Sequence, residues 1–137
     1  MKKKNLFFSA MLFFSILPLT LFAGCDKDTN CYLDVKVVEE STVDPISGAV
    51  ISGVTVPGAI VEVYQDGGNV QANGVTKGNG VFSTHFDAPA IVKIKAKLQL
   101  YNAAGQAAGE RRGETAVRLI QGETITAQIT LGSQVYY

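Results

Sequence analysis

Two long segments of this sequence alternate strictly between apolar and polar residues. In residues 90–101, aliphatic side chains alternate with Lys93, Lys95, Lys97 and a glutamine. Residues 123–131 repeat the pattern, with threonine and glutamine between aliphatic side chains. A period of two over this length is typical of a β-strand that buries one face and exposes the other to water. The chain is therefore expected to form an antiparallel sheet with one apolar side.

Shorter runs of apolar and β-branched residues predict six further strands, separated by turns rich in glycine. The pair Asn79-Gly80 predicts one such turn, because these residues readily take the positive φ angles that short hairpins need. Residues 102–113 are rich in Ala, Gly and charged side chains, and predict a long flexible loop. The six strands are expected at residues 31–40, 46–52, 59–65, 70–76, 81–86 and 114–120.

No segment after Cys25 shows a helical period of apolar residues. Each sheet has one apolar face to bury, so two sheets must pack against each other. We therefore expect an all-β fold, a single antiparallel β-sandwich of about seven strands.

Three short motifs resemble the carboxypeptidase-regulatory-like, or transthyretin-like, domains. Residues 57–63 are similar to the Gly-Ala-x-Val-x-Val strand of that family, and residues 122–131 to its closing strand. Thr76, Gly80 and Phe82 match its Thr-Asp-x-x-Gly-x-Phe turn, with a lysine in place of the Asp. The resemblance implies a prealbumin-like or Ig-like Greek-key sandwich with a structural or recognition role and no catalysis.

The first 24 residues have the three parts of a secretory signal peptide. Three lysines precede an apolar run at residues 6–23, and Ala23 and Gly24 precede Cys25. This resembles the signal peptide of Bacteroidetes-like lipoproteins, with Phe22 where a leucine is usual. The resemblance implies that the chain is cut before Cys25, that acyl groups on Cys25 bind membrane lipid, and that the protein is an outer-membrane lipoprotein. Plain secretion and a retained membrane helix are the alternatives.

The charged residues after the cysteine have two interpretations. They are either a solvated tether or a sorting signal, because acidic residues at this place resemble the surface-export signals of Bacteroidetes lipoproteins. In enterobacteria, an Asp after the cysteine would instead retain the protein in the inner membrane, so surface and periplasmic placement both stay open. The sorting residues are Asp26, Lys27 and Asp28, in a chain organised as signal peptide (1–24), lipidated tether (25–30) and β-sandwich (31–137).

The charge balance argues against a nucleic-acid partner. The whole chain carries 12 basic and 12 acidic residues. Removal of the leader would take three lysines away, which leaves a net charge of about −3 and no basic stripe.

The two cysteines are Cys25 and Cys31. If Cys25 carries lipid, Cys31 is expected to be a small buried thiol, the alternative being an intermolecular disulfide or a modified thiol.

No constellation of residues predicts catalysis, a metal site or a cofactor. The one histidine, His85, is expected on the solvent side of its strand, without the cysteine partners of a structural zinc site. Asp66 and Asn69 offer oxygen ligands for calcium, but they lack a defined loop pattern. We therefore expect a protein that is not an enzyme and binds no cofactor and no metal.

The remaining candidates concern binding. Three lysines share one strand face, which is either a soluble sheet face or a site for an acidic glycan or phosphate, and five tyrosines could form an aromatic platform. We predict a lipid-anchored envelope module that contacts an unknown protein or glycan through loops 66–69 and 102–113. The alternative is a structural or scaffold subunit of a larger envelope assembly. The candidate binding residues are Asp66, Asn69, Lys93, Lys95, Lys97, Arg111 and Arg112, and the tyrosines are Tyr32, Tyr64, Tyr101, Tyr136 and Tyr137.

Overall fold

The chain forms nine β-strands in the computed structural model, which describes residues 28–51, 53–65 and 70–137. In this part of the chain there is no helix that could cross a membrane. The signal peptide and several predicted site residues lie outside the described residues. These site residues are Cys25, Asp26, Lys27, Asp66 and Asn69.

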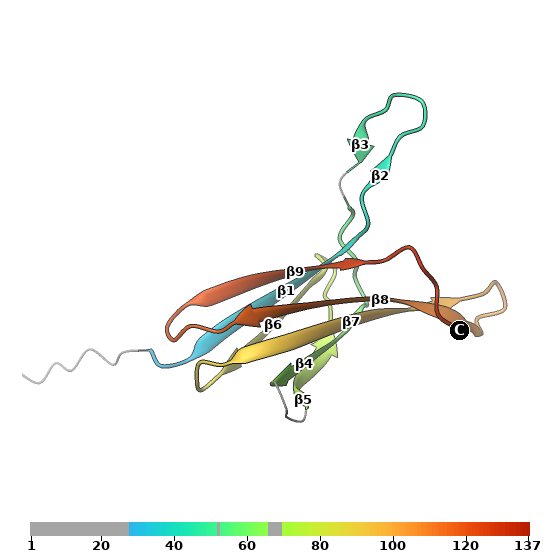
Figure 1. Cartoon of the computed structure of the whole chain (residues 1–137). Helices are drawn as coiled ribbons and strands as arrows, with labels where there is room; N and C mark the ends of the chain where they lie inside the picture. Colours follow the sequence, from blue (N-terminus) through green and yellow to red (C-terminus); the bar gives the residue numbers. More distant parts are fainter. Residues whose placement is uncertain (1–27, 52, 66–69) are drawn as a thin grey trace, which may run out of the picture.

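Seven of the strands form two sheets that face each other (Figure 1). One sheet has the order β6-β1-β9, where β6 is Val81–Phe86, β1 is Cys31–Glu39 and β9 is Thr124–Leu131. The other has the order β5-β4-β7-β8, where β5 is Val70–Val75, β4 is Ile60–Gln65, β7 is Ile91–Tyr101 and β8 is Ala107–Arg118. The predicted all-β sandwich is confirmed.

One strand pair departs from the antiparallel arrangement that the sequence predicts. β1 runs parallel to β9, with Tyr32 opposite Thr124 at one end and Glu39 opposite Leu131 at the other. Every other pair of named strands in the described chain is antiparallel. The first and last strands of the sandwich are therefore neighbours. The chain crosses to the four-stranded sheet for β4 and β5, returns beside β1 as β6, and crosses again for β7 and β8 before it ends with β9.

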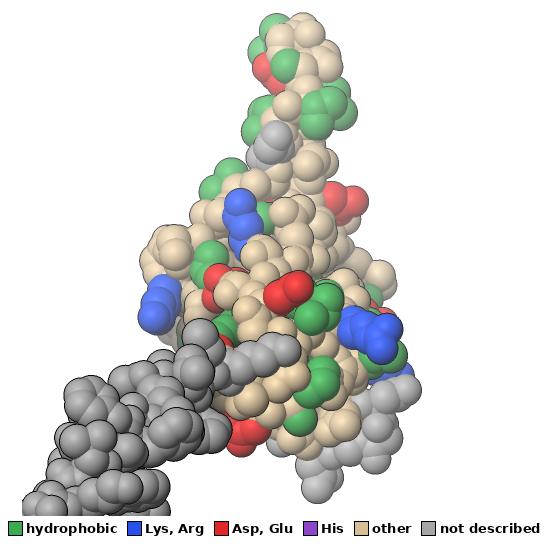
Figure 2. All heavy atoms as spheres, turned by 90° about the vertical axis from the view of Figure 1, so that its left-hand side faces the viewer, with side chains coloured by type: hydrophobic (Ala, Val, Ile, Leu, Met, Phe, Trp, Pro, Cys, Tyr) green, Lys and Arg blue, Asp and Glu red, His purple; other side chains and the backbone are tan. Residues whose placement is uncertain are grey.

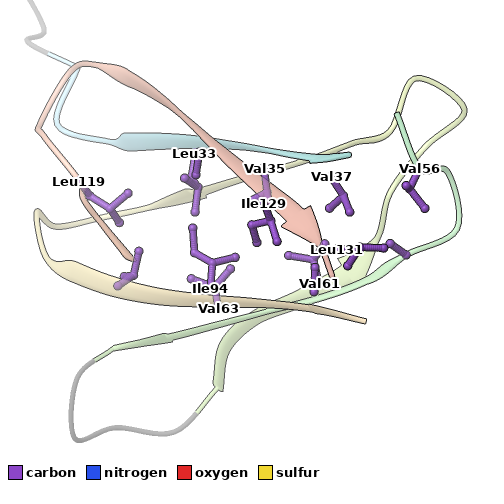
Figure 3. Packing of buried hydrophobic residues seen from close by; sticks show 14 of the residues in the cluster. Leu33, Val35, Val37, Val56, Val61, Val63, Ile94, Leu119, Ile129 and Leu131 are labelled. Carbon is purple, nitrogen blue, oxygen red and sulfur yellow. The ribbon is translucent and has the colours of Figure 1, made fainter. Parts of the chain in front are cut away.

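The core lies between the two sheets and consists of aliphatic side chains (Figure 3). Leu33 of β1, Ile94 of β7 and Ile129 of β9 are almost fully buried. Burial of each such side chain stabilises the fold by roughly 1.5–3 kcal/mol. The alternation predicted for β7 and β9 is confirmed, since the aliphatic residues point inward while Lys95 is exposed.

The prediction of a long loop at residues 102–113 is wrong. β7 continues to Tyr101 and β8 begins at Ala107, which leaves a short turn between them. In this turn the Asn102 side-chain oxygen accepts hydrogen bonds from the backbone N–H groups of Ala104 and Gln106, both at 2.9 Å. The first half of β8 was missed because its small and charged residues show little apolar alternation.

Of the strand predicted at residues 46–52, the structure shows only Val50–Ile51 as a strand among the described residues. The chain instead makes a hairpin of two short strands, β2 (Thr42–Val43) and β3 (Val50–Ile51), joined by a turn at residues 44–49. This hairpin projects away from the sandwich (Figure 1).

The two sheets approach each other most closely along β8 and β9. A Cβ atom on Gly113 would lie 2.4 Å from the carbonyl oxygen of Thr130. Arg111 joins the same strands, because its guanidinium group donates to the carbonyl oxygens of Gly132 at 2.8 Å and Leu131 at 3.2 Å. Gly113 and Arg111 thus close one side of the sandwich.

Candidate functional site

The projecting hairpin extends the end of β1. The backbone N–H of Glu39 donates to the carbonyl of Val54 at 2.8 Å, and that of Val56 donates to Val37 at 2.9 Å. Further out, Thr42 lies opposite Ile51 and Val43 lies opposite Val50. The ribbon therefore has its base in the sandwich and its tip in solvent.

The tip of the hairpin is held by its own hydrogen bonds. The Asp44 carboxylate accepts from the backbone N–H of Ile46 at 2.9 Å and from the hydroxyl of Ser47 at 2.7 Å. These two bonds lower the pKa of Asp44 below its ordinary value. The backbone N–H of Gly48 donates to the carbonyl of Asp44 at 2.8 Å, with Gly48 at a φ of 68°. The turn is thus ordered without any contribution from the body of the protein.

Apolar side chains on the hairpin face water. Ile46, at the tip, is 96% exposed, and Val50 is 70% exposed. Figure 2 shows apolar side chains gathered on the segment that projects above the body. Exposed apolar side chains that concentrate on one element are typical of a surface that meets another molecule. The exposed members are Val43, Ile46, Val50, Ile51 and, at the neck, Val54.

A second surface lies on the outer face of the four-stranded sheet. It is a shallow groove of about 530 Å³ that crosses β4, β7 and β8. The strand register places Glu62, Lys95 and Glu114 in one row across these strands. The groove is lined by Glu62, Tyr64, Lys95, Ala96, Lys97, Glu110, Arg112, Gly113, Glu114 and Tyr136.

Two tyrosine rings in the groove are each held by a cation. The ammonium of Lys95 lies 5.4 Å from the centre of the Tyr64 ring. The guanidinium carbon of Arg112 lies 4.7 Å from the centre of the Tyr136 ring. Such contacts contribute about 0.5–1 kcal/mol at exposed sites, so they favour one placement of each ring.

Tyr136 reaches the groove because the C-terminal segment pairs with the edge of β8. Its backbone exchanges two hydrogen bonds with Glu110, of 2.8 and 2.9 Å. Gly109, at a φ of 133°, makes room for this pairing, since a Cβ atom there would lie 2.5 Å from the side chain of Val135. A ring that is distant in sequence therefore completes the groove.

Hydrogen bonds and ion pairs link the charged groups of the groove. The hydroxyl of Tyr64 donates to the Glu62 carboxylate at 2.6 Å, and Lys97 lies 3.5 Å from the same carboxylate. The Tyr64 hydroxyl and the nearby lysines lower the pKa of Glu62, although burial opposes this effect. The bond to Glu62 raises the pKa of Tyr64. Arg112 pairs with Glu110.

The structure brings some of the predicted binding residues together and separates others. Lys95, Lys97 and Arg112 line the groove. Lys93 is exposed on the same strand and lies outside the groove lining. Arg111 points to the opposite side of β8, where it bonds β9 and pairs with Glu39 at 3.2 Å.

The remaining predicted residues lie elsewhere. Asp28 is exposed and accepts hydrogen bonds from the Tyr32 hydroxyl at 2.9 Å and the Asn30 backbone at 3.0 Å. His85 is exposed, as predicted, with its ring centre 6.3 Å from that of Tyr32.

Of the five tyrosines, Tyr64 and Tyr136 share the groove. Cys31 is buried and forms no disulfide with another described residue, so its expected burial is confirmed. No group of three or more His, Cys, Asp and Glu side chains in the described ranges could hold a metal ion.

Sequence reasoning missed the hairpin and the role of Tyr136. The run Asp-Pro-Ile-Ser-Gly at residues 44–48 carries the residue types of a turn, and this signal could have shown that Ile46 stands at a tip. No local signal could show that Tyr136 packs beside Arg112, because that contact depends on the pairing of distant segments.

Comparisons with known proteins find no match at the level of sequence. No protein-family model matches the chain, and no curated protein matches it. The resemblance to carboxypeptidase-regulatory-like domains and to Bacteroidetes lipoproteins therefore gains no support from them.

Comparison of structures finds partial likenesses to pilin domains of Gram-positive bacteria. One is GBS52, the minor pilin of Streptococcus agalactiae, with 18% identity and a TM-score of 0.46 over 77% of this chain and 45% of that one. Another is the N-terminal domain of the shaft pilin spaA of Lactobacillus rhamnosus GG, with 10% identity and a TM-score of 0.44 over 80% of this chain and 99% of that one. This chain spans less than half the length of GBS52. At these scores the likeness says nothing about what the chain binds.

Proposed function

We propose that this chain is a non-catalytic structural subunit of a bacterial cell-envelope assembly, and that its β2–β3 hairpin binds a neighbouring protein of that assembly. The single observation that carries the proposal is the exposed apolar hairpin, whose tip residue Ile46 is 96% exposed on a turn with its own hydrogen bonds.

The energetics favour a protein partner for the hairpin. Burial of an exposed Val or Ile side chain gains roughly 1.5–3 kcal/mol, and the hairpin offers several such side chains in one place. Because the Asp44 turn is already ordered, a partner would bind it at a small cost in conformational entropy. The partner is therefore expected to present an apolar pocket that admits Ile46.

The position of the hairpin suits a chain that is anchored at its other end. β1 begins at Cys31 and ends at Glu39, and the hairpin follows the end of β1 (Figure 1). We propose that Cys25 carries lipid and that residues 25–30 are the tether. The strand then separates the membrane from the hairpin, on either the surface or the periplasmic face of the outer membrane.

Site-specific crosslinking in cells tests the proposal. A photoreactive residue at position 46 is expected to give one discrete adduct with another envelope protein, whereas the same residue at position 126, exposed on β9, is expected to give none. Ile46→Lys and Val50→Lys should abolish co-purification of that protein, and Thr42→Lys, a polar position on the same hairpin, should not. Absence of an adduct at position 46, or equal loss in all three variants, would contradict the proposal.

A further inference from the structure

We infer that the outer groove of the four-stranded sheet is a second binding site, which takes a neutral saccharide with vicinal hydroxyl groups. This goes beyond the proposed function, because the groove lies on a different surface from the hairpin and its ligand belongs to a different chemical class.

The size of the groove suits a short stretch of a saccharide chain. Its volume of about 530 Å³ lies within the range of small-molecule sites, which is roughly 300–1,000 Å³. The groove crosses three adjacent strands and is partly open to solvent. A polymer can therefore lie across the sheet without having to thread an end into a closed cavity.

The charges of the groove favour a neutral ligand. Its walls carry three cations, from Lys95, Lys97 and Arg112, and three carboxylates. Lys97 is paired with Glu62 and Arg112 with Glu110. A polyanion would be repelled by the three carboxylates and a polycation by the three cations. An apolar ligand would have to strip water from charged groups at a high cost. Hydroxyl groups, which both donate and accept, can satisfy charges of either sign.

One donor and one acceptor in the groove are available to such a ligand. Lys95 and Glu114 lie directly opposite each other on β7 and β8. Across the described residues, the Glu114 carboxylate has no hydrogen bond or ion pair. The Lys95 ammonium lies over the Tyr64 ring and interacts electrostatically with Glu62, but it donates no hydrogen bond to a described residue. Opposite residues of antiparallel strands have Cβ atoms about 5 Å apart. A vicinal diol fits this pair, because one hydroxyl accepts from the ammonium of Lys95 while its neighbour donates to Glu114.

The tyrosine rings supply the other half of saccharide recognition. Sugar rings carry C–H groups on their faces, and these pack against aromatic rings while the hydroxyl groups around the edge form hydrogen bonds. Tyr64 and Tyr136 lie in the same groove as Lys95 and Glu114. Their cationic neighbours hold them in place before a ligand arrives, which reduces the entropy that binding must overcome.

Affinity electrophoresis of the full chain in detergent tests the inference. The probes are dextran, mannan and xylan, each as the native polymer and after periodate cleavage of its vicinal diols followed by borohydride reduction. We expect at least one native polymer to retard the protein, and its cleaved form to do so at least tenfold more weakly. A highly charged peptide, poly-glutamate or poly-lysine, should not displace the polymer.

Two variants and one control locate the binding. Glu114→Gln and Tyr136→Ala should each weaken retardation at least tenfold while the melting temperature stays near that of the parent. Glu123→Gln removes an exposed carboxylate in the turn before β9 and should leave retardation unchanged. Retardation by none of the three polymers, retardation that survives periodate cleavage, or equal binding by the Glu114→Gln variant would overturn the inference. Ile46→Lys should not alter retardation, so the test of saccharide binding and the test of the hairpin proposal give independent results.

Discussion

The hydroxyl of Thr76 donates a hydrogen bond of 2.6 Å to the carbonyl oxygen of Val56. The same hydroxyl accepts from the backbone N–H of Ala59 at 2.9 Å. Of the side chains whose burial is described, that of Thr76 is the one buried polar group. It ties the end of β5 to the segment that leads into β4.

Thr76→Val is therefore expected to destabilise the fold. The change keeps the shape of the side chain but leaves two buried backbone groups without a partner, at a cost of about 1–3 kcal/mol each. Chemical denaturation should show a loss of about 2–6 kcal/mol. Thr76→Ser keeps the hydroxyl and should lose less than half of that amount, so equal losses in the two variants would contradict this account.

Gly113→Ala is expected to lower the melting temperature, because β8 has no room for a side chain where it meets β9. The added Cβ would lie 2.4 Å from the carbonyl oxygen of Thr130, and overpacking of this kind costs about 1–3 kcal/mol or more. Gly78→Ala is the matched control, since nothing lies within 4 Å of a Cβ atom at that position. Differential scanning calorimetry of both variants checks the prediction.

Ile94→Asp is expected to prevent folding. Ile94 is 0% exposed at the centre of the core, and a carboxylate there would be buried without a partner. Ile91→Asp, on the same strand but 59% exposed, should remain folded. Circular dichroism and dispersion of amide NMR signals distinguish the two outcomes. A folded Ile94→Asp variant would show that Ile94 does not face the core.

Tyr64→Phe is expected to raise the pKa of Glu62. The Tyr64 hydroxyl is the largest of the influences that hold this pKa below its ordinary value of 4.5. A lowered pKa in the folded state means that the ionised carboxylate stabilises the fold above pH 4.5, and that this contribution is lost as the pH falls through the folded-state pKa. In the variant this contribution should be smaller, and its loss should be complete at a higher pH. Titration of the Glu62 carboxyl carbon by NMR, in both proteins, measures the shift directly.

Cys25→Ala is expected to block processing of the leader. If Cys25 is the lipidated residue, the variant should incorporate no labelled palmitate and keep the mobility of the precursor on a gel. Cys31→Ala, which removes the buried thiol, should be labelled and cut like the parent. Normal processing of Cys25→Ala would contradict the lipoprotein hypothesis.

Much of the sandwich was predictable because its strands bury one face. The alternation at residues 90–101 and 123–131 follows from that burial, and the aliphatic residues Ile94 and Ile129 of these segments lie in the core. The turn at Asn79-Gly80 was also predictable, since Gly80 takes a φ of 72°. The partners of each strand were not predictable in this way, because alternation reports which face is buried and not which strand lies alongside. The parallel pairing of β1 with β9 is the clearest example.

The candidate surfaces were predictable only in part. The lysines of β7 share an outer face because they are two residues apart, so the presence of Lys95 and Lys97 in the groove follows from the sequence. Arg111 and Arg112 lie on opposite sides of β8, and this could be expected only if the segment were known to be a strand. Its small and charged residues do not indicate one. Tyr136 joins the groove through backbone pairing with Glu110. Neither segment has a sequence pattern that indicates this long-range pairing.

The parallel pairing of β1 with β9 also decides how the sandwich carries mechanical load. Because the two strands point the same way, the residues before β1 and those after β9 leave the pair at opposite ends (Figure 1). A pull between these ends slides the strands past each other, so the backbone bonds along the whole pair oppose the force together. A hairpin pulled at its open end instead yields one bond at a time. A chain tethered before β1 and loaded beyond β9 would be pulled in the direction in which this pair is strongest.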